Sequence, residues 1–134
     1  NTNKPNLALE NYSKCLQLNP NNKEAIFERG KLYYGYSKFN EALNDFNNYV
    51  KIDTQNPTAY FYLGNVYYGL KNYDQAIQYF DAVLRFNSDF SDSYLNIGLS
   101  YIGKNDKTNA CLNFNKAKEL GNQNAIAQIK QHCQ

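Results

Sequence analysis

The stretch Tyr60–Val83, YFYLGNVYYGLKNYDQAIQYFDAV, carries the pattern that decides the fold. Small and aromatic residues stand in it at fixed offsets, and the same residue types return 34 positions earlier and 34 positions later. The three sets are Gly30, Tyr33, Gly35, Ala42, Phe46; Gly64, Tyr67, Gly69, Ala76, Phe80; and Gly98, Tyr101, Gly103, Ala110, Phe114. A constant period without insertion or deletion indicates a stack of equivalent structural units.

Each unit predicts two helices separated by a short break, because its apolar residues recur at helical spacing on both sides of the break. The chain is expected to be one domain, residues 1–134. It divides into an N-terminal half repeat at 5–22, full repeats at 23–56, 57–90 and 91–124, and a capping helix at 125–134. The half repeat corresponds to a second helix whose first helix is missing.

The repeated glycines predict close contact between helices. Gly30, Gly64 and Gly98 lie in the middle of helices, where glycine costs about 1 kcal/mol relative to alanine. We expect that cost to be offset by the approach of a neighbouring helix through Ala42, Ala76 and Ala110. The repeated tyrosines and phenylalanines are then expected to fill the space on either side. Because they recur with the fold, core packing is favoured over an aromatic ligand box.

Composition favours a folded domain with a core. The 134 residues are 43% hydrophobic and 16% aromatic, and no run approaches the roughly 20 apolar residues of a membrane helix. The net charge is +2 with scattered Lys and Arg, so we expect neither nucleic acid nor an anionic membrane as a partner.

No motif for catalysis, phosphate binding or metal ligation is present in the sequence. The single histidine, His132, stands beside Cys133, and adjacent helical residues do not face each other. We therefore expect no enzyme activity, no metal site and no cofactor.

The pattern resembles the tetratricopeptide repeat (TPR), a helix–turn–helix unit of 34 residues. The second repeat carries the resemblance most fully, through Tyr60, Leu63, Gly64, Tyr67, Ala76 and Phe80. The resemblance implies an all-α, right-handed helical solenoid that acts as a protein-interaction scaffold. Arg29 departs from the pattern, since it stands where leucine is usual, and predicts different packing against the first helix.

In this family the first helix of each repeat lines the concave face, which implies a groove for a peptide or protein segment. The expected groove residues are Glu24, Phe27, Lys31, Tyr34, Phe61, Asn65, Tyr68, Leu95, Leu99 and Ile102. Two apolar rows stand out: Phe27, Phe61 and Leu95 form one, and Tyr34, Tyr68 and Ile102 form the other. We expect both rows to lie outside the packing core and to be exposed for a partner.

Some TPR co-chaperones hold a C-terminal carboxylate with Lys, Asn and Arg side chains. Asn65, Asn96 and Lys130 fall near three of those places in this chain, but Phe61 and Ile126 replace two of the cations. Since charge-assisted hydrogen bonds supply much of that grip, the sequence disfavours a chaperone-tail site.

The three cysteines leave two interpretations open. Cys111 is expected to point toward the last helix, which carries Cys133. Cys111 is then either a small buried thiol or one half of a disulfide, as paired cysteines in similar terminal TPR repeats imply. A disulfide would indicate an oxidising compartment, periplasmic or extracellular, whereas free thiols allow a soluble cytoplasmic protein.

Two other functions remain open. The open apolar flank of the first helix, with Leu7, Leu9, Tyr12 and Leu16, allows two copies to pair as a dimer or a longer superhelix. The chain begins at Asn1 rather than Met, so it is also expected to be trimmed from a longer protein. It would then serve as a regulatory region of that protein.

Overall fold

The computed structural model describes residues 4–134, with side chains from Leu7 onward; residues 1–3 of the expected domain lie outside the described part. Eight helices account for most of the described chain. They are α1 (Lys4–Leu18), α2 (Lys23–Gly35), α3 (Phe39–Ile52), α4 (Pro57–Gly69), α5 (Tyr73–Phe86), α6 (Ser91–Gly103), α7 (Lys107–Glu119) and α8 (Gln123–His132).

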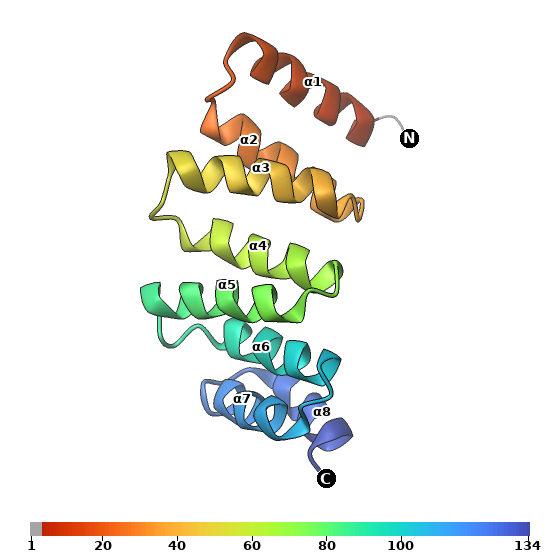
Figure 1. The fold of residues 1–134 in the computed structure, drawn as a ribbon, viewed down its shortest axis with the longest axis vertical. Helices are drawn as coiled ribbons and strands as arrows, with labels where there is room; N and C mark the ends of the chain where they lie inside the picture. The colour runs from red at the N-terminus through yellow and green to blue at the C-terminus, as the bar shows by residue number, and fades with distance from the viewer. Residues whose placement is uncertain (1–3) are drawn as a thin grey trace.

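Each helix packs against the next one along the chain, so the helices form one elongated stack with the termini at opposite ends (Figure 1). The prediction of an all-α helical solenoid is therefore confirmed. Three phenylalanine side chains at equivalent places, Phe46, Phe80 and Phe114, are fully buried and form the centre of the core in successive repeats.

The mid-helix glycines make room for these rings. A Cβ atom on Gly64 would lie 2.5 Å from the ring of Phe80, and one on Gly98 would meet Phe114 equally closely. The expectation that alanines supply the facing surface is thus incomplete. The alanines are buried, but the ring of the second helix in each repeat lies directly over the glycine of the first.

Arg29 changes the packing at the N-terminal end of the stack. Its Nε and Nη2 donate to the two carboxylate oxygens of Asp45 at 2.8 and 2.7 Å, and its Nη1 donates to Ser13 Oγ of α1 at 3.3 Å. Asp45 is only 1% exposed. Arg29 therefore links α2 to α3 through a bidentate ion pair and to α1 through a hydrogen bond. In the later repeats, Leu63 and Ile97 occupy the position of Arg29.

Candidate peptide-binding groove

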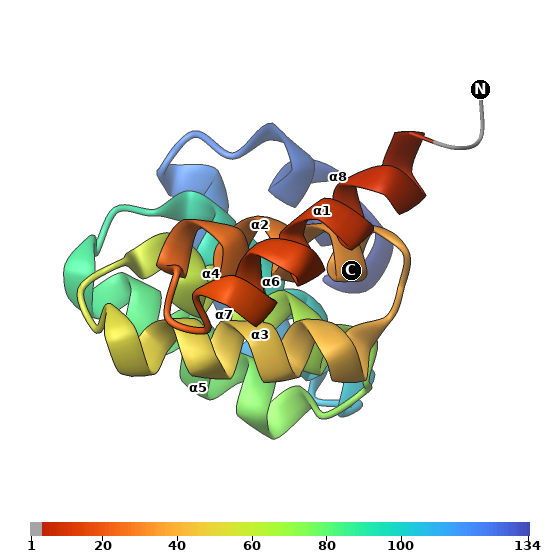
Figure 2. The ribbon, with the colours of Figure 1, turned by 90° about the horizontal axis from the view of Figure 1, so that it is seen from above.

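The helices α2, α4 and α6 form the inner side of the stack. Consecutive members of this set contact each other, α2 with α4 and α4 with α6. Figure 2 looks along the stack and places them on one side, with α3 and α5 on the other. A surface that runs across α2, α4 and α6 is therefore the candidate site for an extended segment.

The row Phe27, Phe61 and Leu95 belongs largely to the core. Leu95 is buried in the cluster formed with Ala110 and Phe114, so the expectation that it is exposed is wrong. Phe27 and Phe61 are half-buried. Side chains at this position lean onto the second helix of their own repeat, which is why an apolar residue here serves the fold.

Neighbouring aromatic rings cover part of Phe27 and part of Phe61. Phe27 lies 5.7 Å from Phe46 and 4.9 Å from Tyr49 between ring centroids. Phe61 lies 5.5 Å from Phe80 and 5.3 Å from Phe90. Only part of each ring remains available to a partner.

The row Tyr34, Tyr68 and Ile102 is more accessible. Tyr68 is 39% exposed, whereas Tyr34 and Ile102 are half-buried. Burial raises the pKa of the Tyr34 and Tyr68 phenols, so both hydroxyls stay protonated at neutral pH. Each can therefore donate a hydrogen bond to a partner.

A pair of amide side chains occupies the middle of this surface. Asn96 of α6 donates its Nδ2 to Oδ1 of Asn65 on α4, at 3.1 Å. This bond leaves the amide donors of Asn65 and the oxygen of Asn96 without a hydrogen-bond partner among the described residues. An amide pair of this kind can accept from and donate to a peptide backbone.

The remaining expected residues lie in different settings. Lys31 Nζ pairs with Glu28 at 2.8 Å and lies 5.3 Å from the centre of the Phe27 ring. Glu24 lines a hollow shared with α1 rather than the middle of the surface. Leu99 packs against the C-terminal core cluster and is half-buried.

Sequence reasoning missed Tyr62. Its ring stacks on Phe46 at 5.2 Å and meets the edges of Phe27 and Tyr34 at 5.8 and 5.7 Å. It stands three residues before Asn65 on α4, one helical turn away on the same face. The helical period of 3.6 residues predicts that Tyr62 lies on the same face as Asn65. Glu28 and Asn96 occupy the position of Tyr62 in the other repeats, so the position does not form an apolar row across the repeats.

The C-terminal end of the stack is closed by α8. In the structure the Sγ atoms of Cys111 on α7 and Cys133 after α8 are bonded, and their Cα atoms lie 5.7 Å apart. Cys15 carries a free thiol that accepts from Asn22 Nδ2 at 3.6 Å.

Membrane spans and metal centres are two other kinds of functional feature. Among residues 4–134, none of the helices combines the length and apolar character needed to cross a lipid bilayer. Within that part of the chain, no three His, Cys, Asp or Glu side chains are grouped so as to hold a metal ion.

Solved structures with the same arrangement of helices include a crystal structure of MamA, 26% identical, with a TM-score of 0.79 over 84% of this chain. This chain spans 66% of that MamA chain. MamA from Desulfovibrio magneticus RS-1 has a TM-score of 0.84, with 22% identity over 90% of this chain and 68% of its own. The first TPR domain of Spaghetti (RPAP3), bound to the HSP90 peptide SRMEEVD, has a TM-score of 0.76. It is 18% identical over 83% of this chain and 90% of its own.

At the level of sequence, the chain is similar to family models rather than to individual curated proteins. No curated protein sequence is similar enough to count as a match. Models described as tetratricopeptide repeat match residues 57–90 and 91–124, and one described as TPR repeat matches residues 37–71. With these matches and the helical solenoid, the chain belongs to the tetratricopeptide repeat family, whose members form protein-interaction modules.

Proposed function

We propose that this protein is a scaffold that binds an extended segment of another protein along the inner surface of α2, α4 and α6. The Asn65–Asn96 amide pair is the observation that carries the proposal. Its unused donors and acceptor match the N–H and C=O groups that an extended backbone leaves without partners. Enzymatic chemistry has no part in this function.

The surface around the amide pair supplies apolar contacts. Three partly exposed aromatic rings lie on α2 and α4, the helices that form the N-terminal part of the groove. They are Tyr34, Tyr62 and Tyr68. Tyrosine is enriched at interfaces because it offers a large apolar ring and one polar atom. We therefore expect the bound segment to carry apolar side chains at intervals along an extended backbone.

The groove is not suited to an acidic C-terminal tail. The RPAP3 domain is bound to a peptide that ends in Glu-Val-Asp. In this chain Phe61 and Ile126 stand where two cations would be needed, and Lys31 is already paired with Glu28. We therefore expect a partner segment with little negative charge.

Selection from a displayed library of random linear peptides tests the proposal. Binding of the selected peptides is measured by calorimetry for the wild type and for Asn65→Ala and Tyr68→Ala. Each substitution is expected to weaken binding about tenfold, or about 1.4 kcal/mol, by removing a groove contact while leaving helicity unchanged. Phe61→Ala is less suitable, since Phe61 packs on Phe80 and its loss would also affect folding.

Leu112→Ala is the matched control, because Leu112 is 63% exposed on α7, outside the groove. It is expected to bind the peptides as the wild type does. Equal binding by Asn65→Ala, Tyr68→Ala and the wild type would place the site elsewhere and refute the groove.

Self-association through α1 is a second candidate, favoured by the exposure of this helix. Leu7 is 55% exposed and Leu18 is 89% exposed, and α1 packs chiefly against α2. A second copy that covers this flank would give a concentration-dependent dimer. Sedimentation equilibrium over a concentration series, with Leu7→Lys as the comparison, tests it; a monomer at every concentration would exclude it.

A further inference from the structure

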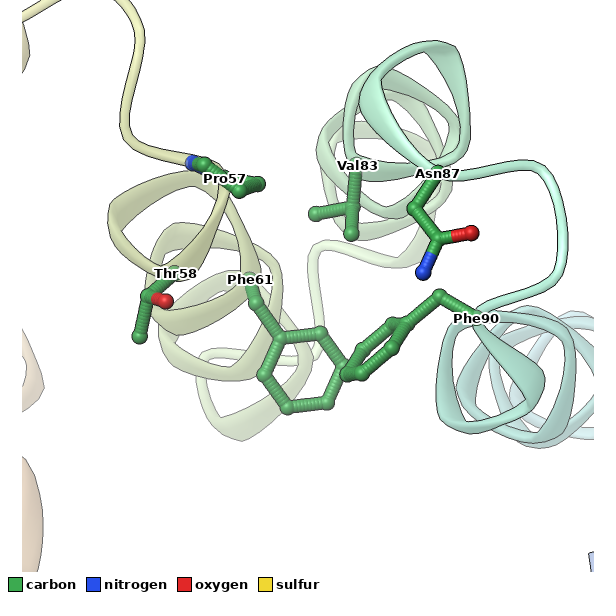
Figure 3. A pocket seen from close by; sticks show the side chains of 6 residues that line it. All are labelled: Pro57, Thr58, Phe61, Val83, Asn87 and Phe90. Carbon is green, nitrogen blue, oxygen red and sulfur yellow. The ribbon is translucent and has the colours of Figure 1, made fainter.

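A small apolar pocket opens at the edge of the groove, between the start of α4, the end of α5 and the residue before α6 (Figure 3). Its volume is about 240 Å³. Its lining residues are Pro57, Thr58, Phe61, Val83, Asn87 and Phe90. The volume lies below the roughly 300–1,000 Å³ of small-molecule sites, so the pocket suits a single side chain.

The equivalent place in the preceding repeat is already filled by an aromatic side chain. Tyr49 stands 34 residues before Val83, and Phe27 stands 34 residues before Phe61. Tyr49 is 5% exposed, and its ring centre lies 4.9 Å from that of Phe27. The pocket therefore lies where valine stands in place of the tyrosine whose ring is buried in the preceding repeat.

The polar end of Tyr49 shows how such a ring is held. Its hydroxyl accepts from Asn56 Nδ2 at 2.8 Å and donates to Asp53 Oδ2 at 3.4 Å. In the second repeat Asn87 occupies the place of Asp53 and Phe90 that of Asn56, so Asn87 is the polar side chain at this end of the pocket. Oδ1 of Asn87 accepts from the Asp89 N–H at 3.1 Å, and its Nδ2 points toward the pocket in Figure 3.

We infer that this pocket binds an aromatic side chain, Tyr or Phe, of the segment held in the groove, in the position that Tyr49 occupies in the first full repeat. The inference rests on the proposed function. Phe61 and Phe90, with ring planes 86° apart, contact the incoming ring, and Val83 forms the floor. Asn87 Nδ2 donates to the phenol oxygen, which favours tyrosine over phenylalanine.

Titration of the wild-type protein with blocked amino acids tests the inference without any substitution. N-acetyl-tyrosinamide and N-acetyl-phenylalaninamide are expected to cause saturable NMR shifts of the Val83 methyl groups and the Asn87 side-chain amide. N-acetyl-leucinamide, the control, is expected to bind at least several-fold more weakly. Equal shifts with the leucine compound, or shifts scattered over other residues, would overturn the inference.

Val83→Tyr fills the pocket from within, as Tyr49 does in its own repeat. This variant is expected to lose the pocket shifts and to bind aromatic-containing groove peptides at least tenfold more weakly. A groove peptide that binds Val83→Tyr as tightly as the wild type overturns this inference and leaves the proposed function standing. A wild-type protein that binds no library peptide overturns the proposed function itself.

Discussion

In the second and third repeats, the second glycine lies against an aromatic ring from the repeat before it. A Cβ atom on Gly69 would lie 2.5 Å from the ring of Phe39, and one on Gly103 would meet the ring of Tyr73 as closely. A Cβ atom on Gly35 would meet nothing within 4 Å. The same glycine is therefore a packing requirement in two repeats and dispensable in the first.

Alanine substitutions separate these cases. Gly69→Ala and Gly103→Ala are expected to lower the free energy of unfolding by about 1–3 kcal/mol, because a methyl group would overlap the ring. Gly35→Ala, the matched control, is expected to leave stability unchanged or raise it by up to about 1 kcal/mol. Urea denaturation measures all three, and equal effects would show that the rings move aside at little cost.

Arg29 and Asp45 form a pair whose members depend on each other. Arg29→Leu leaves a buried carboxylate without its partner and is expected to cost about 3–5 kcal/mol. Arg29→Leu/Asp45→Asn reproduces the apolar and amide character of Ile97 and Asn113, which occupy these places in the third repeat. The double variant should recover most of the stability that Arg29→Leu loses, as measured by thermal unfolding. A double variant no more stable than Arg29→Leu would refute the coupling.

The sequence marks these positions as special, but it does not predict which side chains contact them. The period of 34 marks Gly64 and Gly98 as special, yet it does not say which ring covers them. Carboxylates usually lie on solvated faces, but Asp45 is buried. Its burial depends on Arg29, which reaches it from another helix.

At the scale of helices, asparagine and aspartate side chains cap the N-termini of α2, α4, α5, α7 and α8. Asn22, Asn56, Asn72 and Asn122 cap α2, α4, α5 and α8 by accepting from backbone N–H groups of the first turn. The cap of α7 is Asp106, whose Oδ1 accepts from the Asn109 N–H at 3.1 Å. Four of these five caps are neutral amides, so the α7 cap alone among them depends on ionisation.

The Asp106 cap should make α7 sensitive to acid. The side-chain amide of Asn109, together with its backbone N–H, lowers the pKa of Asp106. A lowered folded-state pKa means that this contribution to stability is present above the unfolded-state value of about 3.9 and is lost as pH falls through the folded value. Below about pH 4, wild-type stability is expected to decline more steeply than that of Asp106→Asn.

The converse substitution provides the control for this prediction. Asn72→Asp places a carboxylate at the cap of α5 and should add acid sensitivity there. Denaturation midpoints from pH 2 to pH 7, about the range that spans the titration, give the comparison. Parallel curves for the wild type and Asp106→Asn would contradict the prediction.

Helices were easier to predict than exposure. Two helices were expected in each full repeat, and the structure has them: α2 and α3, α4 and α5, α6 and α7. Apolar spacing and breaks such as Asn19–Asn22 mark these helices locally. The expectation that Leu95 is exposed was wrong because Leu95 packs against Ala110 and Phe114 of α7, a contact between helices that no local pattern encodes. The pocket beside Phe61 also depends on contacts between helices, so it could not be predicted from the sequence. The sequence does show that Val83 occupies the position of Tyr49 in the next repeat.

At the scale of the whole molecule, the two ends of the stack are held differently. The helix α1 packs chiefly on α2, whereas α8 packs on α7 and is also joined to it through Cys111 and Cys133. The bond spans a sequence separation of 22 residues, and a loop of that size contributes about 3 kcal/mol in the chain-entropy account. The sequence left this pair open, since the approach of the two thiols depends on how the turn at Gly121 directs α8.

Because a stack transmits stability mainly between neighbours, loss of this bond should act locally. Under oxidising conditions, amide hydrogens of α1 are expected to exchange fastest and those of α8 to be well protected. A reducing agent, or Cys111→Ser/Cys133→Ser, should speed exchange in α8 and the end of α7 and leave α2 to α5 unchanged. Cys15→Ser is the control and should change nothing in α8. Equal acceleration in every helix would show that the stack opens as one unit, and no change on reduction would exclude the disulfide.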